Sequence, residues 1–416
     1  MKNMTVENIC KACGGELHGT APDTEAVCVV LDSRKLEPGG VFIATRGEKV
    51  DGHSFIPQVF EKGALAVVCE ELPDKEYGPC ILVKDSFAAL TAIAAFYRTQ
   101  LDCRIIGVTG SVGKTTTKEQ ITAVLRKKYK VCATEGNYNN EIGVPLTLLR
   151  IREDDDYAVV EMGINHFGEM SRLTAVVHPD MAVITVIGEC HLEALGDLDG
   201  VLRAKSEIFE GMKEDAPAFL NADDAKLSTV QRKNIIWFGE TDHARGGQSA
   251  AEAIGRYCGL TDEEIEEALA EFSPLPGRGH VVKCSGFDLI DDCYNANPTS
   301  MRYSIDRLCR LAPAGRVAIL GDMFELGEKE AELHACVGRY AAECGVEKLI
   351  VAGALSKHTA EAYEALSKRS AECYGNTEAL LEAVSDRDFS GQIVLIKASH
   401  GMHFERIVEK LEERGK

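Results

Sequence analysis

Short apolar runs, separated by turns and by helical patterns, recur along the whole chain. They stand at residues 27–33, 40–45, 64–69, 80–83, 104–109, 157–161, 181–187, 287–292, 316–322, 348–353 and 393–399. Runs of this length, bounded by turn residues, predict buried strands. From residue 104 onwards the runs alternate with helical patterns, which is typical of a parallel sheet covered by helices on both faces. The pattern therefore predicts an α/β fold.

The chain is predicted to form three domains. Its 416 residues correspond to several domains at about 100–200 residues each. A capping box at Thr261–Glu264 opens a helix, and Pro274, Pro276 and Gly277 then interrupt the pattern. We expect an N-terminal α/β domain, a central domain with a doubly wound parallel sheet, and a C-terminal Rossmann-like α/β domain, at residues 1–103, 104–276 and 277–416.

Residues 108–120, VTGSVGKTTTKEQ, look like a phosphate-binding loop with unusual glycine spacing. The common loop has a glycine five positions before the glycine of its GK pair, and that position here is Val108. A strand that ends at Thr109 and a helix that begins near Lys114 would still present backbone N–H groups to an anion. Lys114 would then reach the β- and γ-phosphates, and the Thr115 hydroxyl would ligate Mg²⁺. The alternative is an ordinary strand–turn–helix that contains GKT by chance.

Two polar side chains follow other predicted strands of the central domain. Glu161 ends the run YAVVE, at the carboxyl edge where ligands of open α/β sheets bind, and its carboxylate suits Mg²⁺. The alternative for Glu161 is a surface charge at a strand end. His191 follows the next strand, but imidazole is a poor first choice for Mg²⁺, so a site role and a core role both stay open.

Outside these strands, polar residues in loops admit a binding role and a structural role. Asn137, Asn139 and Asn140 lie in one loop, where they could recognise a sugar or peptide or could only form a turn. Arg34 could pair with a diphosphate or could form a surface salt bridge. Arg278 follows a glycine at a predicted domain junction and could contact a triphosphate.

Several longer motifs together resemble the Mur ligase family. They are the shortened loop TG-x-x-GKTT, TEGNYNNEIGVPLTLL at 134–149, EMGINHFGE at 161–169, the segment 178–207, DDCYNANPTSM at 291–301 and GDMFELG at 321–327. The similarity covers nearly the whole chain. It implies a UDP-muramoyl substrate domain, an ATP-binding P-loop domain and a ligase domain. The activity it implies is ATP-dependent addition of D-alanyl-D-alanine to UDP-N-acetylmuramoyl-tripeptide, through an acyl phosphate, in peptidoglycan synthesis.

The resemblance also implies roles for individual residues. Lys205 would otherwise be expected on a solvated helix face, but the family carries a carbamoylated lysine at this place. The implied catalytic residues are Lys114, Glu161, His191 and Lys205, and the implied magnesium ligands are Thr115, Glu161, His191 and Lys205. The implied ATP contacts are Gly110, Ser111, Val112, Gly113, Lys114, Thr115, Thr116, Arg278, Asp292, Asn295 and Asn297. The implied contacts of the UDP-linked substrate are Ser33, Arg34, Asp51, Gly52, His53, Asn137, Asn139 and Asn140, and those of the dipeptide are Lys397 and Ser399.

Composition restricts the class of partner. The chain has 46 Lys+Arg against 66 Asp+Glu, a net charge of −20, which disfavours nucleic acid as a partner. The apolar stretch Phe87–Tyr97 is too short to cross a bilayer, and the first residues lack a charged-then-apolar signal. Fifteen cysteines are then expected to be free thiols in a reducing cytoplasm. We expect small-molecule substrates, no transmembrane segment and a monomer.

Three departures from the family pattern leave a second function open. A small antiparallel sheet and an adenine-holding asparagine normally follow the position of Gly239, and here ETDHARGG leads directly to a helix. Val186 replaces an asparagine, and His400 replaces an arginine. The alternative function is a divergent paralog that binds a cell-wall precursor or partner with little or no ATP turnover. A Mur-like ligase for folate or another amino acid, and a phosphotransferase, fit the motifs less well.

Overall fold

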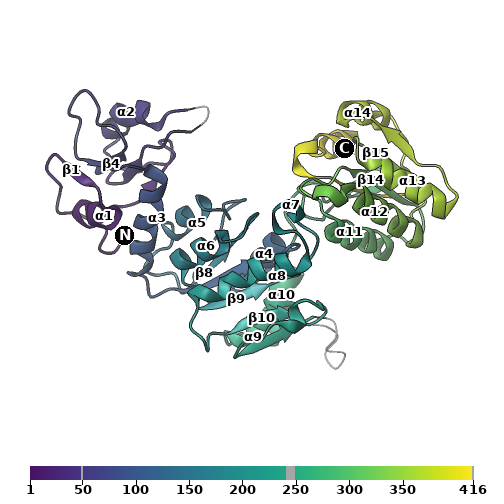
Figure 1. Cartoon of the computed structure of the whole chain (residues 1–416), viewed down its shortest axis with the longest axis horizontal. Coiled ribbons are helices and arrows are strands. Elements are labelled where there is room, and N and C mark those ends of the chain that lie inside the picture. The colour runs from purple at the N-terminus through teal and green to yellow at the C-terminus, as the bar shows by residue number, and fades with distance from the viewer. Residues whose placement is uncertain (48–49, 240–248, 415–416) are drawn as a thin grey trace. The chain divides into compact units, whose positions relative to one another are not determined.

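The computed structural model describes residues 1–47, 50–239 and 249–414, and Figure 1 labels its helices and strands. By their internal contacts the residues form two compact units. The first unit comprises Met1–Gly110, Thr117–Thr185 and Arg203–Ala270, and the second comprises Ser111–Thr116, Val186–Leu202 and Glu271–Lys416.

The first unit begins with a five-stranded sheet of short strands. The strands are β1 (Glu16–His18), β2 (Val29–Val30), β3 (Val41–Ile43), β4 (Ala66–Cys69) and β5 (Cys80–Leu82), in the order β1-β5-β4-β3-β2. β1 pairs antiparallel with β5, and the remaining pairs are parallel. The accompanying helices are α1 (Val6–Cys13), the 3-10 helix η1 (Gly52–Phe55), α2 (Ile56–Glu61) and α3 (Ser86–Arg98).

The same unit contains a six-stranded sheet in which every described pair is parallel. Its strands are β6 (Arg104–Thr109), β7 (Val131–Ala133), β8 (Tyr157–Glu161), β9 (Met181–Ile184), β10 (Ala218–Asn221) and β11 (Ile235–Phe238). The order β11-β10-β9-β6-β8-β7 places later strands on both sides of β6, which is a doubly wound topology. The helices that follow or connect these strands are α4 (Lys114–Arg126), α5 (Gly143–Leu148), α6 (Glu169–Val177), α7 (Leu192–Leu195), α8 (Leu198–Ser206), η2 (Glu207–Gly211), η3 (Leu227–Thr229), α9 (Ala250–Tyr257) and α10 (Asp262–Ala270).

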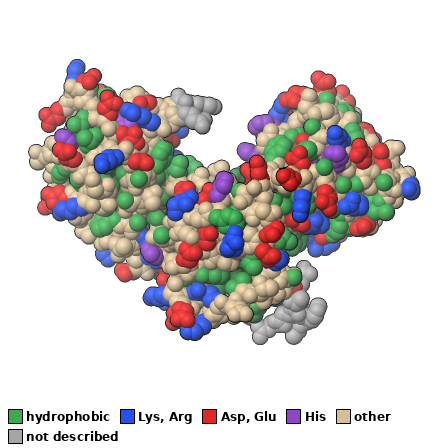
Figure 2. Space-filling view, viewed as in Figure 1, with side chains coloured by type: hydrophobic (Ala, Val, Ile, Leu, Met, Phe, Trp, Pro, Cys, Tyr) green, Lys and Arg blue, Asp and Glu red, His purple; other side chains and the backbone are tan. Residues whose placement is uncertain are grey.

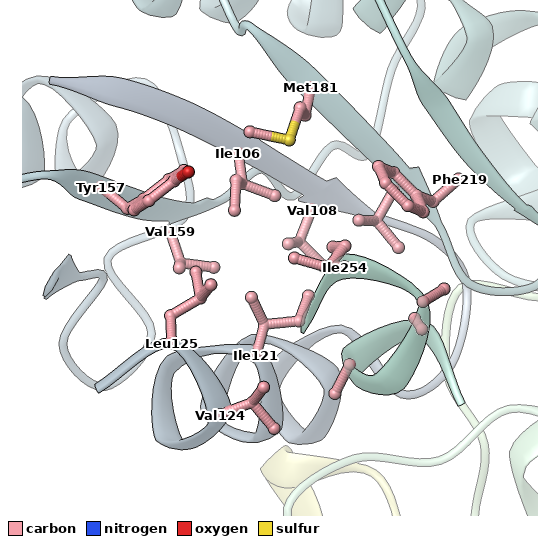
Figure 3. Close-up of a cluster of buried hydrophobic side chains, with 14 of the residues drawn as sticks. Ile106, Val108, Ile121, Val124, Leu125, Tyr157, Val159, Met181, Phe219 and Ile254 are labelled. Atoms are coloured by element: carbon pink, nitrogen blue, oxygen red, sulfur yellow. The ribbon is translucent and has the colours of Figure 1, made fainter. Parts of the chain in front are cut away.

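Alternation along β6 explains why helices cover both faces of this sheet. Ile106 and Val108 point into a core with Ile121 and Leu125 of α4 and with Ile254 of α9 (Figure 3). The intervening residues of β6 face the opposite side, because successive side chains of a strand alternate. Because β6 carries apolar side chains on both faces, helices must cover both faces of the sheet to bury them.

Helix α3 connects the first sheet with the second by packing against helices of both. It packs against α1 and also against α5 and α6. Near its end the Tyr97 hydroxyl donates to the Ile151 carbonyl at 2.7 Å, and Arg98 Nε donates to the Val177 carbonyl at 2.9 Å. These bonds hold the N-terminal sheet against the loops and helices of the central sheet.

The second unit is built on another six-stranded sheet. Its strands are β12 (His280–Cys284), β13 (Phe287–Asp291), β14 (Arg316–Gly321), β15 (Lys348–Ala352), β16 (Glu372–Tyr374) and β17 (Ile393–Lys397), in the order β12-β13-β17-β14-β15-β16, and β12 is antiparallel. Its helices are α11 (Pro298–Leu311), η4 (Gly327–Lys329), α12 (Glu330–Glu343), α13 (Ser356–Ser367), α14 (Thr377–Ser385), η5 (His400–Met402) and α15 (Glu405–Arg414). Ala318 and Leu320 face α11, α12 and α13, whereas Val317 and Ile319 face α14 and α15. The predicted α/β fold with three sheets is confirmed.

One predicted strand is shorter than expected. The run at 181–187 predicts a strand to Ile187, but β9 ends at Ile184. The carbonyl of Val186 instead accepts a hydrogen bond from the Ser111 N–H at 2.7 Å. The chain leaves the sheet here because it is bonded to the loop that follows β6.

The surface and the thiols agree with the composition. On the face shown in Figure 2, acidic and basic side chains are intermingled over the coloured surface. All fifteen cysteines are free thiols. Within the described residues, no helix has both the length and the apolar character needed to span a bilayer.

Candidate active site

The loop after β6 depends on glycine at two positions. Gly110 has φ +147° and Gly113 has φ +83°, values that favour glycine. A Cβ on Gly110 would lie only 1.9 Å from Thr185 Oγ1. α4 begins at Lys114, as the sequence predicts, so the loop leads straight into a helix N-terminus. This is the arrangement that binds phosphate through backbone N–H groups and the helix dipole.

Ser111 ties this loop to its neighbours in the second unit. Its hydroxyl donates to the Gly188 carbonyl at 3.1 Å and accepts from the Gly188 N–H at 2.9 Å. Asn297 Nδ2 donates to the Ser111 carbonyl at 3.5 Å. Asn297 also caps α11 by accepting the Ser300 N–H at 2.7 Å. The start of α11 therefore adjoins the loop.

A cavity of about 280 Å³ opens over the loop, and its lining residues all belong to the second unit. The lining comprises Ser111–Thr116 together with Gly277, Arg278, Gly279, Ile290, Asp292, Asn295, Ala296, Asn297, Ser300, Tyr303, Ser304, Arg307, Arg310 and Lys397. Five of these residues are cationic, and one is a carboxylate. In a chain with a net charge of −20, this concentration of cations marks an anion-binding cavity.

Asp291, a residue not predicted from the sequence, shapes the rim of the cavity. Its buried carboxylate accepts the Gly277 N–H at 2.6 Å, and its carbonyl accepts the Gly279 N–H at 2.7 Å. The guanidinium carbon of Arg278 lies 3.6 Å from the centroid of the Tyr294 ring. These contacts fix the loop that brings Arg278 to the cavity.

Lys397 lies in this same cavity and is 2% exposed. Its ammonium is 2.8 Å from Asp292 Oδ2 and donates to the Asn295 carbonyl at 3.0 Å. The Asn295 side chain accepts the Ala296 N–H. Lys397 is therefore grouped with the predicted nucleotide residues, although the family resemblance implies a dipeptide contact.

Ser399, the other residue implied for the dipeptide, does not line the cavity. Its buried hydroxyl accepts the Phe324 N–H at 3.0 Å, and its own N–H donates to the Asp322 carbonyl. In the structure Ser399 fixes the turn that follows β14.

Glu161 retains hydrogen-bonding capacity within the first unit. The residue is 1% exposed, and its Oε1 accepts a hydrogen bond from Asn139 Nδ2 at 2.7 Å. Its Oε2 is buried and has no hydrogen-bond partner among the described residues. The Thr134 hydroxyl accepts the Glu161 N–H and so holds the strand end. A buried carboxylate oxygen without a partner suits a hard cation such as Mg²⁺.

His191 is held by a carboxylate. Its backbone has φ +51°, and its Nδ1 lies 2.5 Å from Glu325 Oε2. Glu325 also has a positive φ, of +60°. With Nδ1–H donated to the carboxylate, the Nε2 lone pair is the one that could meet a ligand.

Lys205 is 1% exposed, so the prediction from its local sequence that it lies on a solvated helix face is wrong. Thr115 is also buried, at 4%. Thr115 and His191 belong to the second unit, and Glu161 and Lys205 belong to the first. Among the described residues, no three His, Cys, Asp or Glu side chains gather into a metal-binding group.

The predicted UDP-binding residues form local hydrogen-bonded turns. Arg34 bonds to Asp32 at 2.8 Å, and these bonds lower the pKa of Asp32 to about 2. His53 Nδ1 lies 2.7 Å from Asp51, and its Nε2 accepts the Glu70 N–H, which is the pattern of a neutral imidazole. Ser33 and Gly52 are held by other contacts. The Ser33 carbonyl accepts a hydrogen bond from the Lys62 ammonium, and a Cβ on Gly52 would lie 2.8 Å from Thr45 N. Glu48 and Lys49 lie outside the described residues.

The asparagine loop lies beside the N-terminal domain. Asn140 Oδ1 accepts the Gly143 N–H at 2.9 Å and so starts α5, while Asn137 is exposed. The Lys35 ammonium lies 5.9 Å from the centroid of the Tyr138 ring. The structure thus brings the Asp32–Arg34 segment near the loop that carries Asn139, the partner of Glu161.

The departures from the family pattern are only partly visible. ETDHARGG, residues 240–247, lies outside the described residues. His400 stacks on Tyr294 with ring centroids 5.3 Å apart, next to Arg278.

Comparisons with known proteins cover the whole chain. Family models match residues 26–98 (Mur ligase family, catalytic domain), 108–282 (Mur ligase middle domain) and 277–400 (Mur ligase, glutamate ligase domain). UDP-N-acetylmuramoyl-tripeptide--D-alanyl-D-alanine ligase of Bacillus subtilis is 36% identical over 453 residues, with 99% of each chain covered. Since this chain has 416 residues, that relative carries residues without a counterpart here.

Solved structures agree with the sequence relatives. MurF from Acinetobacter baumannii superposes with a TM-score of 0.85 at 29% identity, covering 98% of both chains. MurF ligase from Thermotoga maritima in complex with ADP gives a TM-score of 0.79 at 28% identity, covering 93% of this chain and 97% of that one. The Bacillus subtilis and Thermotoga maritima relatives are named as ligases, and neither name supports the non-catalytic alternative. On this identity and coverage, the chain belongs to the Mur ligase family.

Proposed function

We propose that this chain is an ATP-dependent ligase that joins D-alanyl-D-alanine to UDP-N-acetylmuramoyl-tripeptide. The observation that carries the proposal is the cationic cavity in which the glycine-dependent loop, Lys114 and Arg278 line one space. Similarity along the full length to ligases with this printed activity supports the choice of substrates. The ADP complex of the Thermotoga maritima relative supports a nucleotide at the loop.

The reaction requires two consecutive substitutions. A carboxylate oxygen of the tripeptide attacks the γ-phosphorus of ATP, the bond from that phosphorus to the bridging oxygen breaks, and ADP leaves. The amine of D-alanyl-D-alanine then attacks the acyl carbon of the resulting acyl phosphate. The carbon–oxygen bond to phosphate breaks, inorganic phosphate leaves, and the amine nitrogen releases one proton as the amide forms.

The chain's own residues lower the cost of bringing two anions together. Lys114 and Arg278 place positive charge in the cavity, where it stabilises charge on the transferred phosphoryl group. The loop N–H groups and the start of α4 add fixed dipoles at the same place. Holding the reactants in line supplies a further large part of the acceleration.

The residues also fit Mg²⁺, which would shield the negative charge of the triphosphate when bound. The partnerless oxygen of Glu161 and the Nε2 of His191 are suitable donors, and the Thr115 hydroxyl stands at the loop end. Lys205 fits only if its amine is carbamoylated, because an ammonium cannot ligate a cation. We propose Thr115, Glu161, His191 and carbamoylated Lys205 as the magnesium ligands.

We assign the substrate contacts on the same basis. Ser33, Arg34, Asp51, Gly52 and His53 are proposed for the UDP group, and the asparagines at 137, 139 and 140 for the muramoyl-tripeptide. The proximity of Lys35 to Tyr138 supports one continuous substrate surface in the first unit. Lys397 and Ser399 are proposed to act near the dipeptide through the loops they hold.

Three further features belong to the proposal. Domain boundaries at 103/104 and 276/277 are supported by the fact that each sheet lies inside one of the three ranges. A cytoplasmic location is supported by the fifteen free thiols. A monomer is proposed because all three substrates have their implied contacts on one chain.

The test is phosphate release by purified protein, with ATP, UDP-N-acetylmuramoyl-tripeptide and D-alanyl-D-alanine each omitted in turn. The proposal predicts sustained release only in the complete mixture. Release that is independent of the dipeptide would contradict a ligase. No release in the complete mixture would favour the non-catalytic alternative.

A further inference from the structure

The segment that leads to His191 lies directly against the first turn of α11. A Cβ on Gly188 would be 2.7 Å from Thr299 Cβ, so this close approach requires glycine. The Thr299 hydroxyl accepts the Glu189 N–H at 3.1 Å and donates in return to Glu189 Oε2. Arg302, three residues farther along α11, donates to the same oxygen from its Nη2 at 2.7 Å. An ion pair and two hydrogen bonds therefore hold the segment on the helix.

The same segment is also bonded to the phosphate loop. Ser111 exchanges two hydrogen bonds with Gly188, and Cys190 Sγ donates to the Ser111 hydroxyl at 3.1 Å. Asn297, the cap of α11, donates to the Ser111 carbonyl. The loop, the segment 188–190 and the start of α11 are thus joined pairwise, and all three belong to the second unit. A shift of any one of them relative to the others breaks at least one of these contacts.

This junction determines how the cations of the cavity are arranged. Lys114 comes from the loop, whereas Arg307 and Arg310 come from α11. A bound polyanion gains from both groups only if both face it at short range, because the Coulomb energy falls with distance. Charges in a binding site therefore depend on the contacts that hold their supporting elements. Glu189 and Arg302 do not line the cavity themselves.

We propose that Glu189 is a positioning residue that holds the phosphate loop and α11 in the arrangement in which their cations bind one polyphosphate group. It acts through Thr299 and Arg302. The proposal rests on the proposed ATP-dependent function, since it concerns the polyphosphate of the same cavity. Its expected effect has the opposite sign to a simple charge effect. Removal of a negative charge near an anion site strengthens anion binding by charge alone, whereas loss of the junction weakens it.

The experiment is calorimetric binding of inorganic tripolyphosphate and of ADP to the full chain, without the other substrates. Glu189→Gln keeps the size of the side chain and an acceptor oxygen, but it loses the charge that pairs with Arg302. It is expected to weaken the binding of both probes about fivefold. Arg302→Met is expected to give the same loss. The double variant is expected to bind no more weakly than either single variant, because all three break one contact.

Thr299 tests the junction without a change of charge. Thr299→Val keeps the shape of the side chain but removes the hydroxyl, and it is expected to weaken the binding of both probes about threefold. Thr299→Ser keeps the hydroxyl and is expected to bind both probes as the unchanged protein does. These two variants decide the question even if Glu189→Gln fails to fold.

The matched control breaks another ion pair of the second unit. Glu378 and Arg406 are also 2.7 Å apart, and neither residue lines the cavity. Glu378→Gln is therefore expected to leave the binding of both probes unchanged.

Unchanged or tighter binding of tripolyphosphate by Glu189→Gln and Thr299→Val would overturn the proposal. Additive losses in the double variant, about 25-fold together, would also overturn it, because the two side chains would then act independently. An equal loss in Glu378→Gln would show a general effect of lost ion pairs and would overturn it as well. Binding is measured without turnover, so the result does not depend on the phosphate-release assay, and the two proposals fail separately.

Discussion

The central sheet and the C-terminal sheet are both largely parallel, yet they use the polar groups at their strand ends differently. At the end of β8, Glu161 has a buried oxygen without a hydrogen-bond partner among the described residues. Beyond β14, the carboxylate of Asp322 accepts the N–H and the hydroxyl of Ser356 at the start of α13. Beyond β17, Ser399 accepts the Phe324 N–H. At these three positions, the central sheet keeps capacity for a ligand, whereas the C-terminal sheet uses the polar groups to build its own loops.

The difference shows that a polar residue at a strand end is not by itself a site. What distinguishes the two kinds of residue is whether their hydrogen-bonding capacity is already used. We therefore expect changes at the central strand ends to alter turnover, and changes at Asp322 or its neighbours to alter stability.

Lys114→Ala should have the largest effect on turnover. Removing the loop cation is expected to lower kcat/KM by about 1,000-fold, because its charge acts on the transferred phosphoryl group. Steady-state kinetics with ATP as the varied substrate would measure this. Lys283→Ala, at an exposed lysine of β12, serves as the control and should be neutral. Full activity in Lys114→Ala would remove the phosphate loop from the mechanism.

Glu161→Gln should separate charge from packing. The amide keeps the size of the side chain and an acceptor for Asn139, but it loses the negative charge. We expect kcat/KM to fall about 100-fold and the Mg²⁺ concentration for half-maximal rate to rise. The melting temperature should not fall, since a buried charge is removed. A lower melting temperature with unchanged Mg²⁺ dependence would instead assign Glu161 a structural role.

Asp322→Ala should show the opposite behaviour. It removes the acceptor for the first N–H groups of α13 and leaves them buried, which costs about 1–3 kcal/mol of unfolding free energy. The KM for ATP should stay within about twofold of its original value, because Asp322 does not line the cavity. Urea unfolding and kinetics on the same variant give both numbers. A large rise in KM without loss of stability would break the comparison.

The smallest expected effect is the contribution of His334 to the pH dependence of stability. Burial lowers the pKa of His334 below its ordinary 6.5, and its Nε2 accepts the Met323 N–H at 3.0 Å. The unfolded chain therefore binds the proton more readily than the folded one. The contribution of neutral His334 to the free energy of unfolding is fully present above about pH 6.5. Below that pH it decreases, by at most about 1.4 kcal/mol per pH unit.

Urea unfolding at pH 5.5 and 7.5 would detect this contribution. His334→Gln, which keeps a donor and an acceptor but does not titrate, should lose part of the pH dependence. An identical slope in both proteins would exclude His334 as its source.

Much of the fold follows from the apolar runs. All eleven predicted runs contain a strand, because buried strands in parallel sheets are apolar on both faces. Six strands were missed: β1, β7, β10, β11, β12 and β16. β1 and β16 are only three residues long, and most residues of β12 are half exposed. Strands of these kinds show little hydrophobic periodicity in the sequence.

The candidate site likewise contains residues that the sequence could predict and residues that it could not. Lys114 and the end of β8 could be predicted because spacing along the chain fixes them. The bond between His191 and Glu325 joins residues 134 positions apart, and local sequence gives no signal for it. Lys205 is buried although its surroundings resemble a solvated helix face, and only the family resemblance pointed to it.

The central claim is that an acid is activated by direct transfer of the terminal phosphoryl group of ATP. The most direct measurement uses UDP-N-acetylmuramoyl-tripeptide with ¹⁸O at both oxygens of the carboxylate that becomes the amide, and follows the label by mass spectrometry after one turnover. We predict one labelled oxygen in each inorganic phosphate released. Unlabelled phosphate, formed at the same rate as the amide, would contradict an acyl phosphate.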